Sequence, residues 1–247
     1  NGNLYVETAD RSLLVYENGS KKPKTVLEEY TGSWNVIFGS YLYGSTGESV
    51  IRVDLSADAP QIETVLQEGV MHSSIVDGHH IYYMNASDNN YLYRCDLDGS
   101  NVRRCFPDGW QGSHFNWKDD ETLAVTARWG AGRVWAHTIF KVGEEDKVRH
   151  LGPGIMDWDG HCIFSPDGKF MSTDGYWNKD GYRSWVIMRL DDEAIISLGR
   201  FYVPEKYKEQ YSRCDLHPRW RPDGSQLAFN SVHEGTRQVY LRNVTWK

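Results

Sequence analysis

Two copies of one short pattern decide the fold: Ile163-Phe164-Ser165-Pro166-Asp167-Gly168-Lys169-Phe170-Met171 and Arg219-Trp220-Arg221-Pro222-Asp223-Gly224-Ser225-Gln226-Leu227. Each copy has an apolar stretch, a Pro-Asp-Gly turn and a second apolar stretch. Proline presets φ at the first turn position, and glycine accepts the positive φ that the turn needs later. Weaker copies lie at Asn116–Leu123 and Ile75–Tyr82. The pattern therefore predicts repeated β-hairpins.

Further strands follow each hairpin. We expect third strands at Tyr91–Leu97, Arg133–Val142, Arg183–Leu190 and Gln238–Asn243, and fourth strands such as Val102–Phe106 and Ile195–Leu198. Units then start near Trp34, His72, His114, His161 and His217, after a partial unit within residues 1–33. The four histidines are 42, 47 and 56 residues apart. Repeats of this length, each with four short strands, are typical of β-propeller blades.

The repeats predict one all-β domain over residues 1–247, a β-propeller of four-stranded antiparallel blades. No stretch sustains a 3.6-residue apolar period, so helices should be rare, with a single turn at Pro204–Gln210. Most propellers close with six or seven blades, and five units plus a fragment fit neither number. We therefore expect a seven-bladed family, with either N-terminal sequence missing from this chain or an incomplete first unit.

Composition and charge restrict the partners. The 247 residues are 13% aromatic and include 23 glycines, which suits a turn-rich β protein. A formal net charge of −7 argues against nucleic acid or an anionic membrane as a partner, although a local basic pocket could still bind a polyanion. No apolar run approaches the roughly 20 residues that span a bilayer.

The four cysteines allow two interpretations. Cys95 and Cys105 flank the turn signal Asp98-Gly99-Ser100-Asn101, so they either face each other as a disulfide or remain half-buried thiols. Cys162 and Cys214 both lie at starts of first strands and form a second candidate pair. A disulfide would indicate an oxidising compartment.

Blade topology predicts where functional side chains gather. The start of a blade's first strand and the loop between its second and third strands lie on the same face. His72, His114, His161 and His217 should therefore surround one mouth of the channel. The loops Trp129–Arg133, Tyr176–Arg183 and His233–Arg237 should lie on that face too.

A metal site is one candidate at this mouth. Cys214 and His217 have metal-ligand spacing, and His161 and His233 are expected on the same face. The alternatives are that each histidine binds backbone at the channel wall, or that Cys162 and Cys214 form a disulfide between blades.

Acid–base and anion-binding groups are the other candidates. Tyr182 and Arg183 follow a loop and should project toward the mouth, where a phenol beside a guanidinium can donate a proton. Alternatively, Tyr182 packs on the next loop and Arg183 is solvated. The predicted substrate-binding residues are His72, Trp129, Tyr176, Arg213, Arg219 and Arg237.

Several motifs together resemble the oligogalacturonate-lyase-like and ulvan-lyase-like propellers. They are Gly160–Gly168, Arg213–Trp220, Ser113–Trp117 and His233–Tyr240, and the resemblance covers about residues 110 to 245. In oligogalacturonate lyases, histidines and a glutamine hold manganese, and another histidine is the base. The resemblance implies that His161 and His217 are ligands and that His114 is the base.

This sequence departs from that pattern at two positions. Cys214 stands where the resemblance predicts the glutamine, which suggests zinc or no metal, and Arg219 stands in place of a further histidine. In the ulvan-type propellers His, Tyr and Arg do the chemistry, and His114, Tyr182 and Arg183 match them.

The leading prediction is a secreted or periplasmic polysaccharide lyase that cleaves an anionic, uronate-containing glycan by β-elimination. Arg183 or a metal would neutralise the carboxylate, His114 would take the C5 proton, and Tyr182 would protonate the leaving oxygen. One alternative is a non-catalytic TolB-like propeller that binds a protein or carbohydrate. A hydrolase with paired carboxylates is less favoured, because acidic residues do not recur at the blade openings.

Overall fold

The structure, a computed structural model, describes residues 3–28, 30, 32–74, 78–88, 91–106, 109–129, 134–209 and 211–244. Within these ranges the side chains of Asn35, His72, Ser74 and Trp129 are not described. The chain forms two compact units, residues 1–106 and 107–247, which we describe separately.

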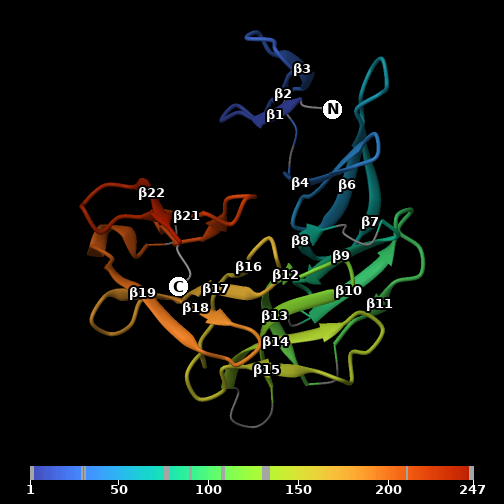
Figure 1. Ribbon diagram of the computed structural model, residues 1–247. Helices are drawn as coiled ribbons and strands as arrows, with labels where there is room; N and C mark the ends of the chain where they lie inside the picture. Colours follow the sequence, from blue (N-terminus) through green and yellow to red (C-terminus); the bar gives the residue numbers. More distant parts are fainter. Residues whose placement is uncertain are drawn as a thin grey trace. The chain divides into compact units, whose positions relative to one another are not determined.

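The first unit contains three antiparallel sheets (Figure 1). The first has three strands, β1 (Leu4–Glu7), β2 (Leu13–Tyr16) and β3 (Lys24–Leu27). The second has four, β4 (Ser33–Phe38), β5 (Tyr41–Ser45), β6 (Ser49–Asp54) and β7 (Ile62–Gln67). The third also has four, β8 (Val70–Ser74), β9 (His80–Asn85), β10 (Tyr91–Asp96) and β11 (Arg103–Arg104).

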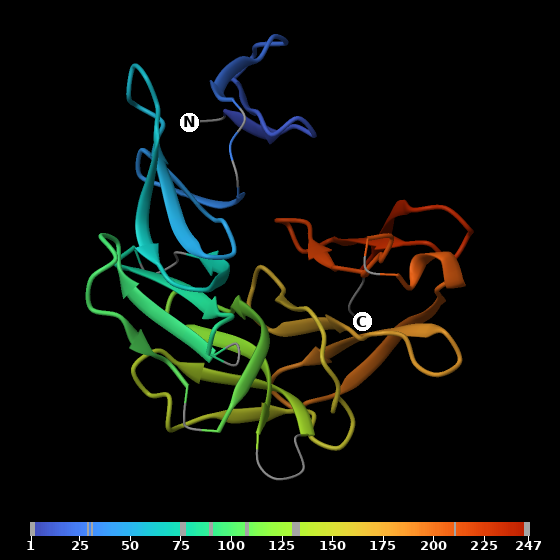
Figure 2. The same cartoon turned by 180° about the vertical axis from the view of Figure 1, so that it is seen from behind.

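The second unit also contains three antiparallel sheets, seen from behind in Figure 2. The first is β12 (Gln111–Trp117), β13 (Thr122–Trp129), β14 (Val134–Lys141) and β15 (Arg149–Leu151). The second is β16 (Cys162–Phe164), β17 (Phe170–Asp174), β18 (Tyr182–Arg189) and β19 (Ile195–Tyr202). The third is β20 (Arg219–Trp220), β21 (Gln226–Ser231) and β22 (Gln238–Asn243). A single 3-10 turn, η1 (Glu205–Tyr207), lies within the stretch predicted to form one.

The all-β, blade-type architecture is confirmed, but the expected number of seven blades is wrong. Every sheet is an antiparallel meander in sequence order, and the described residues form six of them. Each unit found in the sequence corresponds to one sheet, and the partial N-terminal unit forms the three-stranded β1–β3 sheet. The prediction of seven blades came from the blade number usual among related propellers. The repeats themselves correspond to six sheets. The assignment of residues 1–247 to one domain stays a prediction.

The hairpins that decided the fold form as expected. Gly168 and Gly224 have φ values of 67° and 73°, the left-handed conformation that the Pro-Asp-Gly turns require. In the first turn, the Ser165 hydroxyl donates to Asp167 at 2.6 Å and accepts from the Phe170 amide at 3.0 Å. The turns therefore fix the register of β16 with β17 and of β20 with β21.

Apolar side chains from neighbouring sheets hold the second unit together. One buried cluster combines Ala124 and Leu151 of the β12–β15 sheet with residues of the β16–β19 sheet, among them Met171 and Met188. Trp185 is fully buried in a second cluster with Leu227 and Phe229 of β21. First strands of successive sheets are in contact, β12 with β16 and β16 with β20. This contact brings the starts of three sheets together.

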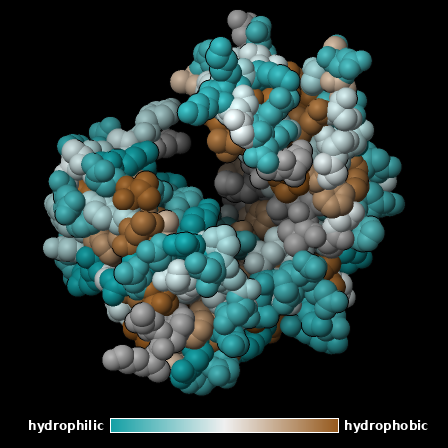
Figure 3. Space-filling view, turned by 45° about the horizontal axis from the view of Figure 1, so that its top comes forward, coloured by the Kyte–Doolittle hydropathy of each residue, from teal (hydrophilic) through white to brown (hydrophobic). Residues whose placement is uncertain are grey.

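The surface and the cysteines complete the description. Hydrophilic residues cover most of the face shown in Figure 3, with hydrophobic residues in patches between them. No helix in the described ranges is long and apolar enough to cross a membrane.

All four cysteines are buried thiols, so neither candidate pair forms a disulfide. Burial raises the pKa of the Cys95 and Cys162 thiols to about 12.

Candidate functional site

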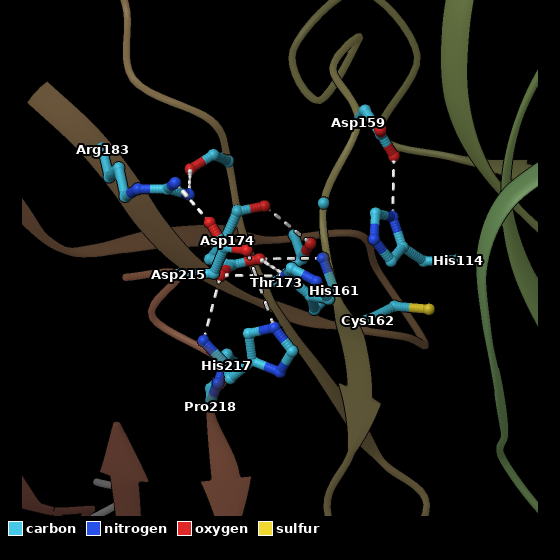
Figure 4. A network of polar contacts seen from close by, with 12 residues as sticks. His114, Asp159, His161, Cys162, Thr173, Asp174, Arg183, Asp215, His217 and Pro218 are labelled. Atoms are coloured by element: carbon cyan, nitrogen blue, oxygen red, sulfur yellow. Dashed lines mark hydrogen bonds and ion pairs between the residues drawn. The ribbon is translucent and has the colours of Figure 1, made fainter. Parts of the chain in front are cut away.

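Three of the four blade-opening histidines lie side by side in the second unit (Figure 4). His114 is in β12, His161 directly precedes β16, and His217 lies two residues before β20. The ring centroids of His114 and His161 are 4.1 Å apart, and those of His161 and His217 are 3.7 Å apart. His72 is in β8 of the other unit, and its side chain lies outside the described residues.

Asp174, at the end of β17, anchors two of these histidines. Its Oδ1 lies 2.9 Å from Nδ1 of His161 and accepts a hydrogen bond of 2.8 Å from the His161 amide. Its Oδ2 accepts from the His217 amide at 3.1 Å. Burial alone would raise the pKa of Asp174, but these contacts lower it below the usual value. The carboxylate therefore stays charged and leaves Nε2 of His161 available to a ligand.

The backbone around the two histidines is closely constrained. A Cβ on Gly160 would meet the Asp174 carbonyl oxygen at 1.7 Å, so only glycine lets this segment approach β17. His217 has a φ of 44° although it is not a glycine and precedes Pro218. Such strain costs on the order of 1–3 kcal/mol and concentrates at functional sites.

His114 has its own carboxylate partner. Nδ1 of His114 lies 3.0 Å from Oδ1 of Asp159, and the Ser113 hydroxyl donates to Oδ2 of Asp159 at 2.8 Å. With Nδ1 directed at the carboxylate, Nε2 is the nitrogen left to accept a proton. A carboxylate that orients an imidazole in this way is the arrangement of a general base.

A third carboxylate, Asp215, joins two arginines to the histidines. Arg183 of β18, only 1% exposed, donates from Nη2 to Oδ1 of Asp215, and Arg213 Nε lies 3.0 Å from Oδ2. His217 Nε2 is 3.8 Å from the same Oδ2. Burial tends to raise the pKa of Asp215, but the His217 hydrogen bond and the two guanidinium charges hold it far below its usual range.

Tyr176, in the loop after β17, lies between this group and His114. Its ring centroid is 6.4 Å from that of His114, and the Arg183 and Arg213 guanidinium carbons are each 5.3 Å from the ring centroid. Burial, aided by the charge of Asp159, raises the pKa of Tyr176 despite the two arginines. The phenol is therefore protonated at neutral pH and can act as a proton donor.

His161, Asp215 and His217 form a group that could hold a metal ion. One donor atom from each lies within 4.8 Å of the others. Two imidazoles and one carboxylate suit zinc, manganese or iron and leave coordination positions open. The Asp174–His161 contact is the outer hydrogen bond that commonly orients a ligating histidine. Burial lowers the pKa of His161, which favours the neutral imidazole that a metal needs.

The other two predicted ligands are outside this group. Cys214 packs in an apolar cluster with Val203 and Val232, and burial raises the pKa of its thiol. His233 Nδ1 is 2.8 Å from the Ser231 hydroxyl, and its ring packs against Phe201 and Tyr240. The spacing of Cys214 and His217 predicted the thiol as a metal ligand. In the structure the neighbouring residue, Asp215, is the candidate ligand instead.

Tyr182 and Arg183 do not act on the same face. Neighbouring residues of a strand point to opposite sides of the sheet. Arg183 is buried against Asp215 rather than solvated, whereas Tyr182 packs on Tyr202, 5.4 Å between ring centroids, under the Arg200 guanidinium. The expectation that both project to one mouth is therefore wrong.

The remaining predicted substrate residues are divided. Arg213 and Arg237 line a pocket beside His217. Arg219 is exposed in β20 and donates to the carbonyl of Pro218 at 2.9 Å. The side chain of Trp129 lies outside the described residues.

Sequence reasoning missed the carboxylates Asp159, Asp174 and Asp215. A signal existed for two of them, because Asp159-Gly160-His161 and Asp215-Leu216-His217 repeat Asp-x-His at two blade openings. Asp174 carries no such signal, since it reaches His161 only through the pairing of β16 with β17.

Comparison with known proteins identifies the fold class. No family model matches the sequence, and no curated protein does. An oligogalacturonate lyase in complex with manganese superposes with a TM-score of 0.73 at 17% identity, covering 99% of this chain and 74% of that one. An oligogalacturonate lyase from Vibrio parahaemolyticus gives 0.74 at 14% identity, over 99% of this chain and 75% of that one. A putative TolB from Agrobacterium tumefaciens gives 0.62 at 15%, over 94% and 84%.

These similarities define the class: the chain has the β-propeller fold that oligogalacturonate lyases and TolB-like proteins share. The resemblance seen in the sequence motifs is thus confirmed for the fold. Sequence identities of 14% to 17% support a shared fold only. The activity of this chain has to be inferred from its candidate site.

Proposed function

We propose that this protein is a polysaccharide lyase that cleaves a uronate-containing glycan by β-elimination. The observation that carries the proposal is the cluster itself. An imidazole oriented by a carboxylate, a group able to hold a cation and a protonated phenol meet at the starts of three sheets. Elimination at a uronate needs a base, a positive charge and an acid, which are the same three parts.

The roles follow from the contacts. His114, held by Asp159, takes the C5 proton on Nε2, and the electron pair of that C–H bond forms the C4–C5 double bond as the C4–O bond breaks. Tyr176 gives its proton to the departing oxygen. This assigns the acid to Tyr176 in place of Tyr182, because Tyr176 lies beside His114. A divalent cation bound by His161, Asp215 and His217 would neutralise the uronate carboxylate and so acidify the C5 proton.

Arg213 supplies positive charge from this chain itself. Its side chain is 40% exposed, whereas Arg183 is buried beneath Asp215. Arg183 therefore acts by fixing Asp215, and Arg213 is the arginine within reach of a bound carboxylate.

Incubation with pectate, ulvan and other uronate glycans tests the proposal. A lyase forms an unsaturated uronate, which absorbs in the ultraviolet. The His114→Ala variant should lose about 10²–10⁴-fold of the rate. The matched variant His79→Gln, at an exposed histidine of the first unit, should keep it.

The second candidate is a TolB-like propeller that binds a protein or carbohydrate without chemistry, and the fold similarity to TolB favours it. Absence of any ultraviolet product, together with measurable glycan binding, would support that function. A polymeric glycan is met outside the cytoplasm, so we also propose a secreted or periplasmic location, which cell fractionation tests.

A further inference from the structure

A buried histidine, His137 of β14, has no role in the proposed function. Its side chain belongs to the interior of the second unit and is only 1% exposed. Both ring nitrogens face threonine hydroxyls: Nδ1 lies 3.0 Å from Oγ1 of Thr126 in β13, and Nε2 lies 3.3 Å from Oγ1 of Thr173 in β17. The ring therefore connects the β12–β15 sheet to the β16–β19 sheet.

The hydrogen bonds around His137 determine which of its nitrogens carries the proton. The Thr126 hydroxyl donates its hydrogen to the carbonyl oxygen of Gly160 at 2.8 Å. Because a hydroxyl has a single hydrogen, Oγ1 of Thr126 is the acceptor for His137, which therefore has its proton on Nδ1. Burial lowers the pKa of His137 to about 4, so the ring is neutral near pH 7 and Nε2 is an acceptor that faces Thr173.

The first connection from His137 to the candidate site runs through the peptide between Gly160 and His161. The carbonyl of this peptide accepts from Thr126, and its amide donates to the Asp174 carboxylate at 2.8 Å. A peptide unit is planar, so the two hydrogen bonds hold one rigid group from opposite sheets. The orientation of this peptide sets where the His161 side chain begins.

The second connection runs through Thr173, the residue before Asp174. Its hydroxyl lies 3.3 Å from Nε2 of His137 and 3.1 Å from the Asp174 carbonyl oxygen, so two acceptors compete for its single hydrogen. The carboxylate of Asp174 contacts both the amide and the ring of His161 (Figure 4). The Thr126 connection is the more direct one, because that hydroxyl has one acceptor and is 2.8 Å from it.

We propose that His137 is a positioning residue for His161. Through the Thr126 hydroxyl it fixes the peptide before His161, and so the distance of the His161 ring from His114. This inference rests on the proposed function, in which His161 helps to hold a cation beside the base His114. The two ring centroids are only 4.1 Å apart, and a displacement of about 1 Å can reduce a rate about 100-fold.

Thr126→Val tests the connection, because it removes the hydroxyl and keeps the shape of the side chain. The matched control is Thr138→Val in β14. Thr138 is also fully buried, and its hydroxyl also donates to a backbone carbonyl, that of Val125 at 3.0 Å. Both variants should be less stable in urea denaturation. Thr126→Val should lose more, because it also leaves Nδ1 of His137 without an acceptor.

Long-range proton–nitrogen NMR spectra of the histidine rings report the position of His161 without turnover. Nδ1 of His161 faces the Asp174 carboxylate, so its ring should show the Nδ1-protonated tautomer. Thr126→Val should shift the His161 ring signals, which the spectrum of His161→Gln assigns, and Thr138→Val should leave them unchanged. In the elimination assay Thr126→Val should lower kcat about 10- to 100-fold with little change in KM, and Thr138→Val should keep the wild-type rate.

A second pair of variants tests the imidazole itself. The amide nitrogen of asparagine reaches about the position of histidine Nδ1, so His137→Asn can still donate to Thr126. His137→Leu places an apolar side chain of similar size there and cannot donate. His137→Asn should therefore keep most of the wild-type rate and the His161 signals, whereas His137→Leu should shift the signals and lower kcat as Thr126→Val does.

Unchanged His161 signals in Thr126→Val would overturn the assignment. So would equal shifts in Thr126→Val and Thr138→Val, because the effect would then be that of any lost buried hydroxyl. If the signals respond as expected while wild-type protein forms no unsaturated product, His137 still positions His161 and the lyase function fails. If product forms and the signals do not depend on Thr126, the lyase function stands and the positioning role fails.

Discussion

Asp174 binds His161 twice, accepting its backbone amide at 2.8 Å and lying 2.9 Å from Nδ1 of its imidazole. The same carboxylate accepts the amide of His217. One fully buried charge therefore sets the positions of two histidines that come from different sheets. His161 and the backbone of His217 therefore cannot move independently of Asp174.

Asp174→Asn should disturb this arrangement without changing its volume. An amide nitrogen cannot accept the hydrogen bonds that Asp174 now accepts, and the neutral side chain no longer orients the His161 ring. Outer hydrogen bonds of this kind typically contribute 10- to 100-fold, so elimination rate or metal affinity should fall by about that factor. Ultraviolet assays and metal titration measure the two effects.

Asp167→Asn is the control for that substitution, because Asp167 is a turn residue on the surface of the same sheet. It should leave the rate and the metal affinity unchanged. Full activity of Asp174→Asn would show that the histidines do not depend on this carboxylate.

Replacing the two tyrosines separately decides the identity of the acid. Tyr176→Phe removes the hydroxyl beside His114 and should lower turnover about 10²–10⁴-fold with little change in KM. Tyr182 packs on Tyr202, on the side of β18 opposite to Arg183. Tyr182→Phe should therefore leave turnover near wild type. The reverse result would restore Tyr182 as the proton donor.

Metal content decides between the two ligand sets. If a divalent cation binds, Asp215→Asn and His161→Ala should each lose it, whereas Cys214→Ser should retain it, because the thiol lies in an apolar cluster. Elemental analysis of the purified variants gives the stoichiometry. Loss of metal from Cys214→Ser alone would favour the ligand set of the sequence analysis.

The fold could be predicted from the sequence because its signals are local. A Pro-Asp-Gly turn needs only neighbouring residues to specify a hairpin, and Gly168 and Gly224 have the positive φ that this turn requires. The convergence of His114, His161 and His217 followed from topology, since each opens a first strand. The repeats also carry the number of sheets, because the five units and the N-terminal partial unit correspond to the six sheets of the described residues.

The chemistry of the site was less accessible, because it depends on contacts between sheets. Asp159 is two residues from His161 in sequence but binds His114, 45 residues away. Cys214 has the spacing of a ligand, yet packing turns its thiol toward Val203 and Val232. Side-chain direction at such positions is decided by tertiary packing, which spacing does not encode.

A buried histidine behind the site should control stability at mildly acidic pH. His137 of β14 is 1% exposed and lies between the hydroxyls of Thr126, 3.0 Å from Nδ1, and Thr173, 3.3 Å from Nε2. Since Thr126 donates its own hydrogen to the Gly160 carbonyl, Nδ1 of His137 is the donor to Thr126. Burial lowers the pKa of His137 from 6.5 to about 4.

Between pH 6.5 and 4 the unfolded chain therefore protonates His137 while the folded chain does not. The contribution of the neutral ring to stability is complete above pH 6.5 and is lost as the pH falls toward 4. From pH 7.5 to 5.0 this one group should remove about 2 kcal/mol from the free energy of unfolding. Urea denaturation at the two pH values measures the loss.

His137→Gln, although less stable at pH 7.5, should lose about 2 kcal/mol less than wild type on acidification. His79→Gln, at an exposed position, should follow the wild-type pH dependence. An equal loss in His137→Gln and wild type would show that the ring is protonated in the folded protein and that other groups cause the acid sensitivity.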